Sequence, residues 1–256
     1  MSDQRTAIIT GAGKRVGAEI ARALIADGWS VLAHVHHDQD SVPDGAAKVA
    51  ADLCDPGSAE HIFAAAAGMP PVRLLVNNAA RFARDEFGAV NVTEFDAHMT
   101  VNVRAPLLLT EGFAAAHAKD GNGEDALVVN LLDSKLAAPN PDFLSYTLSK
   151  YALAALTELA ARALAPSGIR VNGVAPALML RSAGQSEENF AVMQRANPLQ
   201  HAVQPEDVIA ALRYLIESPA VTGEVLTIDG GQRFWSLERD VQFLSPSRGG
   251  QSLETK

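Results

Sequence analysis

Short, continuously apolar runs alternate with longer helical patterns along the whole chain. Within a run the residues do not switch between apolar and polar, which is typical of parallel strands covered on both faces. Because a helical pattern follows each run, the crossovers are expected to be right-handed. The alternation predicts an α/β fold with a doubly wound parallel sheet of about seven strands flanked by helices. The runs cover residues 7–9, 30–32, 72–76, 127–132, 170–175 and 225–228, and a third-strand pattern ends at 52–53.

The helical patterns carry regular apolar stripes. Val16, Ile20 and Leu24 recur every four residues, and Gly28 then supplies a stop signal. Another stripe runs through residues 148–159. Neither an internal repeat nor an interdomain linker interrupts the alternation, so residues 1–256 are expected to form a single domain.

Two segments depart from the alternation. Residues 177–204 lie between a strand and a helix and are predicted to be a mobile flap. Residues 233–256 follow the last strand and become rich in serine, glycine and charge. They are predicted to form a C-terminal extension that is partly flexible.

The composition argues against several classes of protein. A formal net charge of −9 disfavours broad binding to nucleic acids or anionic membranes, although a local basic pocket can still hold an anion. No apolar run approaches the roughly 18 residues of a membrane span, and residues 1–10 lack the regions of a signal peptide. Cys54 is the only cysteine and has no internal disulfide partner. We therefore expect a cytoplasmic protein that binds a small molecule.

A glycine-rich segment follows the first run and opens the first helical pattern. Gly11 and Gly17 let the backbone turn sharply and approach a pyrophosphate, and a helix N-terminus offers N–H groups to it. Lys14 and Arg15 add positive charge at the same place, beside Val16. The position between strand and helix, more than the letters themselves, predicts a dinucleotide-binding domain. The segment reads Thr10-Gly11-Ala12-Gly13-Lys14-Arg15-Val16-Gly17.

Histidines stand at the tip of the second strand. A carboxylate there would receive the ribose 2′-hydroxyl of NAD and repel the 2′-phosphate of NADP. His36 and His37 come first, beside Lys14 and Arg15, so the balance favours NADP(H), with Asp38 as the counter-argument. No cysteine or acidic residue falls at metal-ligand spacing beside these histidines, so no metal is expected.

Two later strand tips carry further candidates for the cofactor site. Asp52 and Leu53 end the third-strand pattern, where a carboxylate could accept a hydrogen bond from an adenine amino group. Asn78 and Ala79 follow the fourth strand, and small residues there let a cofactor lie across the sheet edge. Ligands of doubly wound folds bind at the carboxyl ends of the strands, so these four residues are expected to bind the cofactor.

Tyr146 and Lys150 stand four residues apart in a helical pattern and therefore share a helix face. A free tyrosine has a pKa of about 10 and is a poor acid or base near neutrality. A nearby ammonium favours the tyrosinate and lowers that pKa. The pair is expected to deliver a proton to a substrate while hydride arrives from a nicotinamide. Alone the motif is unspecific, and its position after the fifth strand supports the interpretation.

Together these motifs resemble the short-chain dehydrogenase/reductase family over about residues 5–232. The resemblance implies a Rossmann fold and an NADP-dependent oxidoreductase that assembles as a homotetramer. It further implies that Tyr146 is the acid, that Lys150 binds the nicotinamide ribose, and that Asn102 holds a water in a proton relay. Pro176 would belong to the cofactor site. The motifs are Thr10-Gly11 to Gly17, Asp52-Leu53, Asn77-Asn78-Ala79, Asn102, Tyr146 with Lys150, Arg170-Val171-Asn172, Ala175-Pro176 and Asp229-Gly230-Gly231.

Three departures from the usual family pattern resemble the pteridine reductase and dihydromonapterin reductase branch. Asp133 stands thirteen residues before Tyr146, where the family usually has a serine, and Ser134 is one residue out of register. The resemblance implies that Phe82 stacks a pterin against nicotinamide, that Arg15 approaches the pterin and the phosphates, and that Asp133 supplies protons. A flat aromatic ring suits a phenyl face, and reducing a C=N bond requires a proton on nitrogen. The predicted activity is hydride transfer from NADPH to a pterin or dihydrofolate-like ring.

Two alternatives to pterin reduction remain open. One is a carbonyl or 3-oxoacyl thioester reductase on the same fold, and Ala80 favours it because pteridine reductases often have a serine there. The other is a non-catalytic NADP(H)-binding regulator, which would have no need of a tyrosine and lysine pair. Separately, Arg233, Phe234 and Trp235 follow the last strand, where exposed aromatics are costly. They are expected to contact another subunit near its substrate pocket.

Overall fold

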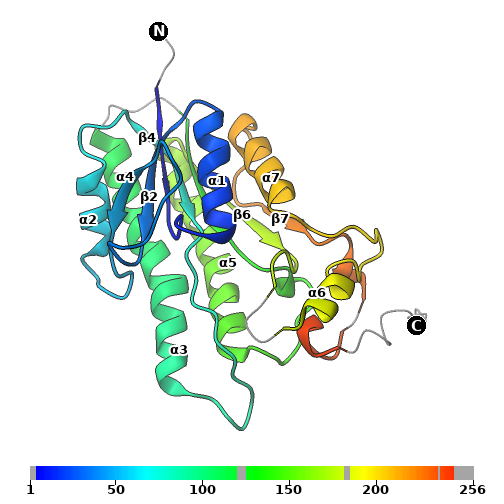
Figure 1. Ribbon diagram of the computed structural model, residues 1–256. Coiled ribbons are helices and arrows are strands. Elements are labelled where there is room, and N and C mark those ends of the chain that lie inside the picture. The colour runs from blue at the N-terminus through cyan, green and yellow to red at the C-terminus, as the bar shows by residue number, and fades with distance from the viewer. Residues whose placement is uncertain (1–3, 120–124, 182–184, 236, 245–256) are drawn as a thin grey trace.

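The computed structural model describes residues 4–119, 125–181, 185–235 and 237–244 (Figure 1). Within these residues seven strands form one sheet in the order β3-β2-β1-β4-β5-β6-β7, and every neighbouring pair is parallel. The predicted doubly wound sheet of about seven strands is confirmed. The strands are β1 (Thr6–Ile9), β2 (Ser30–Val35), β3 (Ala47–Ala50), β4 (Val72–Asn77), β5 (Ala126–Leu131), β6 (Ile169–Pro176) and β7 (Val225–Ile228).

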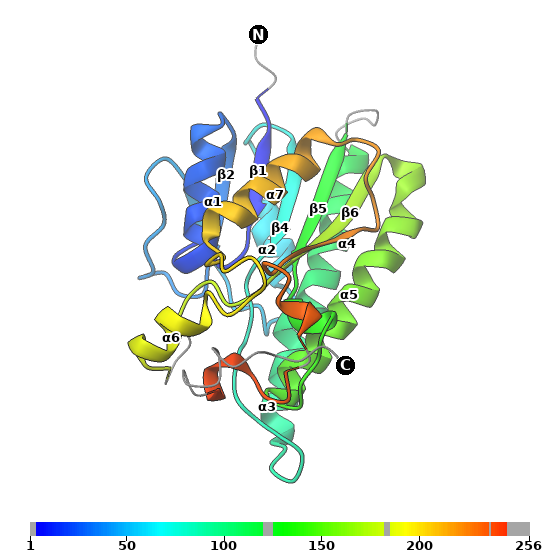
Figure 2. The same cartoon turned by 90° about the vertical axis from the view of Figure 1, so that its right-hand side faces the viewer.

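Helices cover both faces of the sheet (Figures 1 and 2). Helices α1 and α7 pack on one face, and α2, α4 and α5 pack on the other. The π-helix η1 joins α3 to α4, and α6 lies beyond the sheet. The helices are α1 (Arg15–Ala26), α2 (Ser58–Ala65), α3 (Val92–Met99), η1 (Thr100–Arg104), α4 (Ala105–Lys119), α5 (Leu144–Leu164), α6 (Glu187–Met193) and α7 (Pro205–Glu217). The short 3₁₀ helices are η2 (Ser134–Leu136), η3 (Ala165–Ser167), η4 (Gln232–Phe234) and η5 (Val241–Phe243).

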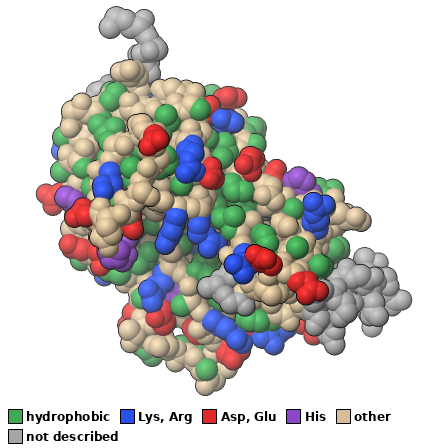
Figure 3. All heavy atoms as spheres, viewed as in Figure 1, with side chains coloured by type: hydrophobic (Ala, Val, Ile, Leu, Met, Phe, Trp, Pro, Cys, Tyr) green, Lys and Arg blue, Asp and Glu red, His purple; other side chains and the backbone are tan. Residues whose placement is uncertain are grey.

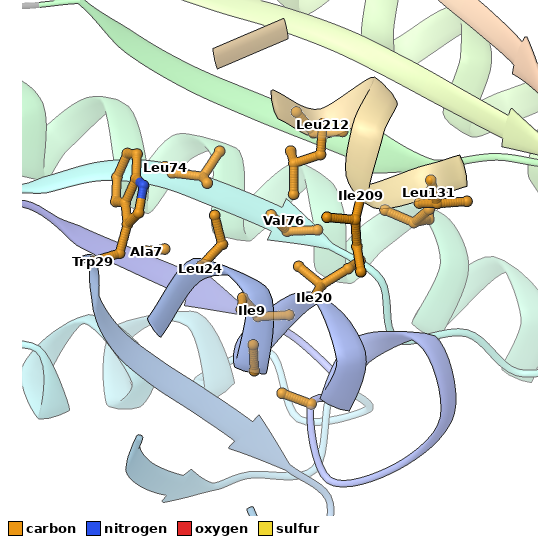
Figure 4. Packing of buried hydrophobic residues seen from close by; sticks show 14 of the residues in the cluster. Ala7, Ile9, Ile20, Leu24, Trp29, Leu74, Val76, Leu131, Ile209 and Leu212 are labelled. Atoms are coloured by element: carbon orange, nitrogen blue, oxygen red, sulfur yellow. The ribbon is translucent and has the colours of Figure 1, made fainter. Parts of the chain in front are cut away.

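Strand β1 shows why the apolar runs are continuous. Ala7 and Ile9 belong to the layer beneath α1 and α7, where they pack with Ile20 (Figure 4). Ile8 belongs to the opposite layer, together with Phe113 of α4. Because both faces of the strand are buried, consecutive positions along it are apolar.

The carboxyl ends of the strands face the region where α3, α6 and the C-terminal segment gather (Figure 2). The structure revises two predictions about this region, one on the end of the third strand and one on the segment 177–204. Strand β3 ends at Ala50, two residues before the predicted end at Asp52, because the chain turns after Ala51. The segment 177–204 is not irregular throughout, since it contains α6, which the Ser186 side chain caps.

Residues 245–256, the last part of the predicted flexible extension, lie outside the described residues, as do residues 182–184 of the predicted flap. Among the described residues, no helix combines the length and the apolar character needed to cross a membrane.

Candidate functional site

A cavity of about 1180 Å³ opens at the carboxyl edge of the sheet. Despite the net charge of −9, Lys and Arg side chains gather across the middle of one face of the molecule, below α1 (Figure 3). Two residues predicted for the site, His37 and Asn102, are not part of the cavity wall. The predicted residues that line it are Gly11, Lys14, Arg15, Val16, Gly17, His36, Asp52, Leu53, Asn78, Ala79, Phe82, Asp133, Tyr146, Lys150 and Pro176.

The glycine-rich turn brings backbone N–H groups to the cavity. Gly11 has φ +65°, and a Cβ on Gly13 would lie 2.9 Å from the carbonyl oxygen of Ser41. Lys14, the N-cap of α1, makes no side-chain cap, so the first N–H groups of the helix are available to an anion. Arg15 has φ +55°, a conformation that costs a non-glycine residue about 1–2 kcal/mol. A compact turn, a helix N-terminus and two basic side chains fit a pyrophosphate.

Asn78 holds the turn against the tip of β4. Its side-chain amide donates to the carbonyl oxygens of Thr10 (2.8 Å) and Gly11 (3.2 Å). In return, the Thr10 hydroxyl accepts from the backbone N–H groups of Asn78 and Ala79, each at 3.0 Å. Asn78 and Ala79 therefore set the floor of the cavity by fixing the turn.

His34 supports the same turn, a role that the sequence analysis missed. Its Nδ1 accepts from the Gly11 backbone N–H at 3.2 Å, and its Nε2 lies 2.9 Å from the carbonyl oxygen of Ala51. Burial lowers the pKa of His34, which favours the neutral ring that this pair of bonds requires. A histidine inside a strand was the available signal, but its direction could not be inferred from the run.

The histidine pair at the tip of β2 is only partly placed as predicted. His36 lines the cavity, whereas His37 stacks on the outer side of His36 with ring centroids 4.0 Å apart. Asp38 is also outside the wall, and Asp40 and Ser41, which the sequence analysis missed, are part of it. The chain bends after β2, where the His37 N–H donates to the Asp40 carboxylate at 3.0 Å, so residues further along reach the cavity.

Asp52 is held at the same end of the cavity. Its Oδ1 accepts from the Cys54 N–H at 2.8 Å, which lowers the pKa of Asp52. The His36 ring lies 3.8 Å from that carboxylate. The group is therefore an ionised acceptor beside a histidine.

At the other end of the cavity, Tyr146 and Asp133 are in direct contact. The Tyr146 hydroxyl donates to Asp133 Oδ2 at 2.9 Å, and the other carboxylate oxygen accepts from the Lys135 N–H at 2.9 Å. Burial raises the pKa of Asp133. A carboxyl group with a raised pKa, bound to a tyrosine hydroxyl, forms a site that can hold and pass a proton.

The expectation that Lys150 lowers the pKa of Tyr146 is wrong for this structure. Burial, followed by the charge of Asp133, raises the pKa of Tyr146 well above its ordinary value. Lys150 Nζ instead donates to the Leu131 carbonyl oxygen at 2.6 Å and lies 5.6 Å from the tyrosine ring centroid. Burial also lowers the pKa of Lys150 to about 8, so the ammonium form of Lys150 is less favoured than that of a free lysine.

Phe82 lies over Tyr146 at this end. Its ring meets the tyrosine ring edge to face, with centroids 4.7 Å apart at 89°, and stacks on Phe143 at 4.4 Å. The ring is still 46% exposed and borders the cavity. An aromatic face is thus available beside the tyrosine hydroxyl.

Buried polar side chains hold the segment that carries Phe82. Asn102 accepts from the Arg81 N–H at 2.7 Å and donates to the Arg81 carbonyl oxygen at 3.0 Å. His98 accepts from the Ala83 N–H at 3.1 Å. The Asn102 side chain, which lies in η1, is thus bound to protein groups, and its predicted role in holding a water stays a prediction.

The segment after β7 closes this end of the cavity. Arg233 and Trp235 line the cavity of their own chain, and Arg233 pairs with Asp229 at 2.6 Å. Phe234 is 71% exposed. The predicted subunit contacts of these residues therefore rest on Phe234 alone, and they stay a prediction.

Comparisons with known proteins place the chain among reductases. The family model described as Enoyl-(Acyl carrier protein) reductase matches residues 11–233. L-xylulose reductase of Bos taurus is 32% identical over 239 residues, covering 89% of this chain and 96% of that protein. Carbonyl reductase [NADPH] 2 of Sus scrofa is 29% identical, covering 88% and 95%. FolM alternative dihydrofolate reductase 1 from Brucella suis, solved in complex with NADP, has a TM-score of 0.83 at 34% identity, covering 91% of this chain and 97% of its own.

Proposed function

This chain belongs to the short-chain dehydrogenase/reductase family and is an NADP(H)-dependent oxidoreductase, and on that basis we propose that it reduces a pterin or dihydrofolate-like ring. The observation that carries the proposal is the contact between Asp133 and the Tyr146 hydroxyl, with the half-exposed Phe82 ring beside it. Likeness to an alternative dihydrofolate reductase supports the same substrate class.

The reacting residues suit reduction of a ring C=N bond. NADPH supplies the hydride, which reaches carbon, and the protein must deliver a proton to nitrogen. Burial raises the pKa of Asp133, which favours the protonated carboxyl group, and the Tyr146 hydroxyl at 2.9 Å passes the proton toward the substrate. Phe82 offers its face to the flat ring. The overall reaction converts a dihydropterin, NADPH and a proton to a tetrahydropterin and NADP⁺.

Residues along the cavity are assigned to the cofactor by position. Gly11, Val16, Gly17, Asn78, Ala79 and Pro176 border its backbone and nicotinamide, with Asp52 and Leu53 at the adenine. Lys14, Arg15 and His36 supply positive charge or N–H donors for the 2′-phosphate, and Arg15 extends toward the substrate. Lys150 would bind the nicotinamide ribose from the floor.

A carbonyl reductase is the second candidate, and likeness to L-xylulose reductase and carbonyl reductase favours it. Such an enzyme needs a neutral donor for a carbonyl oxygen. Asp133, which accepts from the Tyr146 hydroxyl, stands where a serine hydroxyl would better hydrogen-bond a carbonyl oxygen, and this opposes the second candidate.

The enzyme is further proposed to be a homotetramer. Helices α4 and α5 leave apolar side chains uncovered, namely Leu107, Leu148, Tyr151 and Leu159. Two neighbouring helices with exposed apolar positions suit packing against the same helices of another copy. Light scattering combined with size exclusion measures the mass, and a monomer at micromolar concentration contradicts the assembly.

NADPH oxidation with a side-by-side substrate panel tests the function. The panel holds dihydrobiopterin, dihydromonapterin, dihydrofolate and several simple ketones and sugars. The proposal expects the highest kcat/KM on a dihydropterin or dihydrofolate. Turnover of ketones or sugars alone, with no pterin or folate reduced, overturns it and favours the carbonyl reductase.

A further inference from the structure

The C-terminal strap, residues 237–244, contributes Leu237, Asp240 and Val241 to the wall of the cavity. It is anchored at Asp142, whose side chain is 2% exposed and lies just before α5. Arg239 donates to both Asp142 carboxylate oxygens, at 2.7 and 2.8 Å, and the Asp240 main-chain N–H donates at 2.8 Å. The anchor therefore uses the Arg239 side chain and the main chain of residue 240, and it does not involve the Asp240 side chain.

The Asp240 side chain turns to the cavity. Its Oδ2 pairs with Lys135 Nζ at 3.0 Å, and its Oδ1 accepts from the Gln242 N–H at 3.0 Å. Lys135 is held in turn by the Asp142 carbonyl oxygen at 2.9 Å. The Lys135 and Asp240 side chains are 11% and 18% exposed, so the carboxylate is fixed and largely shielded from bulk water.

The carboxylate also lies within electrostatic reach of the reacting hydroxyl. Besides burial and Asp133, the charge of Asp240 raises the pKa of Tyr146. Both Asp133 and Asp240 line the cavity. A substrate at Tyr146 therefore meets two acidic side chains, one at the proton-transfer position and one on the strap.

We propose that Asp240 is a specificity-determining residue whose carboxylate accepts hydrogen bonds from the amino-pyrimidine edge of the substrate ring, an inference that rests on the proposed function. A carboxylate has about four lone-pair sites, and the two contacts in the structure leave acceptor capacity. It matches an edge with two adjacent N–H donors, as it matches a guanidinium. Lys135 fixes the direction of the carboxylate. Ketones and sugars lack such an edge.

The test compares two ring substrates that differ only in that edge. One is a dihydropterin with a 2-amino group, and the other is the corresponding dihydrolumazine, which has a 2-oxo group. The measured quantity is the ratio of their kcat/KM values. Wild-type enzyme is expected to favour the amino ring by about tenfold or more, the usual consequence of an unmatched hydrogen bond to a charged group.

Asp240→Asn is expected to bring the ratio close to one, because an amide replaces two acceptor oxygens with one. Arg239→Gln is the matched control, since it removes the two side-chain hydrogen bonds to Asp142, while the Asp240 main-chain bond and the Lys135 pair still hold the Asp240 carboxylate. It is expected to lower both kcat/KM values by the same factor. If Asp240→Asn unfolds, Asp240→Ser replaces it, because the anchor uses only the main chain of residue 240.

An unchanged ratio in the Asp240 variants, with normal wild-type turnover, overturns the inference and leaves the proposed function standing. The same ratio change in Arg239→Gln also overturns it, since Asp240 would then act only by holding the strap. Wild-type enzyme that reduces neither ring, nor any folate, contradicts the proposed function itself and the inference with it.

Discussion

Truncating Phe82 separates substrate stacking from structural packing. The ring is 46% exposed and contacts Phe143 and Tyr146, with centroids 4.4 and 4.7 Å away. A fully buried Phe→Ala change costs about 3–5 kcal/mol, so a half-exposed ring should cost about 2 kcal/mol of unfolding free energy. That loss lowers Tm by roughly 4–8 °C in a chain of this size. Stacking on a substrate adds about 0.5–1.5 kcal/mol to binding, which is about a two- to tenfold change in KM.

The assay measures kcat and KM for a dihydropterin, KM for NADPH, and Tm. Phe82→Ala should raise the dihydropterin KM by about two- to tenfold and change kcat little. Phe82→Leu should restore much of the stability but not the KM, because an aliphatic side chain fills space without offering an aromatic face. Phe87→Ala is the matched control, since this ring follows in the same segment and is 80% exposed.

Two results would refute the reasoning about Phe82. An unchanged dihydropterin KM in Phe82→Ala means that the ring does not stack on the substrate. A KM that returns to the wild-type value in Phe82→Leu means that bulk, and not the aromatic face, is what the site requires.

Three further predictions concern the proton path and the glycine-rich turn. Tyr146→Phe should lower kcat by about two to four orders of magnitude and leave the affinity for NADPH nearly intact. Lys150→Ala should lower kcat and the affinity for NADPH together. A near-normal kcat in Tyr146→Phe contradicts the mechanism. Asp133→Ser removes a carboxylate that raises the pKa of Tyr146, so the basic limb of the kcat–pH profile should move to lower pH and kcat for a dihydropterin should fall. If the variant gains turnover of ketones and loses none of its turnover of dihydropterin, the proposal of pterin reduction is contradicted. Burial lowers the pKa of His34, which accepts from the Gly11 N–H, so the unfolded chain binds a proton there more readily than the folded protein. The free energy of unfolding should therefore fall as the pH drops below about 6.5. If Tm depends on pH equally in His34→Gln, His34 is not the cause.

The sheet and the cofactor end could be predicted because their signals are local. A strand buried on both faces favours apolar residues at consecutive positions, as at Ala7, Ile8 and Ile9, so the run itself indicates the fold. The carboxyl ends of parallel strands share one edge, which is why Gly11 and Asn78, 67 residues apart, could be assigned to one site.

The reacting end was harder because its chemistry depends on distant contacts. The spacing of Tyr146 and Lys150 correctly indicated a shared helix face, but the pKa of Tyr146 is governed by burial and by Asp133, which sequence spacing does not reveal. Asp240 meets Lys135 only because the strap folds back across the cavity. The stacking of the His37 ring on His36 depends on the bend after β2, which the sequence does not reveal, and cofactor binding by His37 stays a prediction.

Asn102 makes contacts that its motif does not reveal. Its predicted role in holding a water stays a prediction, and its side chain binds both the N–H and the carbonyl oxygen of Arg81, next to Phe82. Asp85, three residues after Phe82, binds the N–H and hydroxyl of Ser145 and so caps α5 directly before Tyr146. One short segment therefore connects the Phe82 ring to the start of the helix that carries Tyr146. A displacement of that segment would move the Phe82 ring and the start of α5 together.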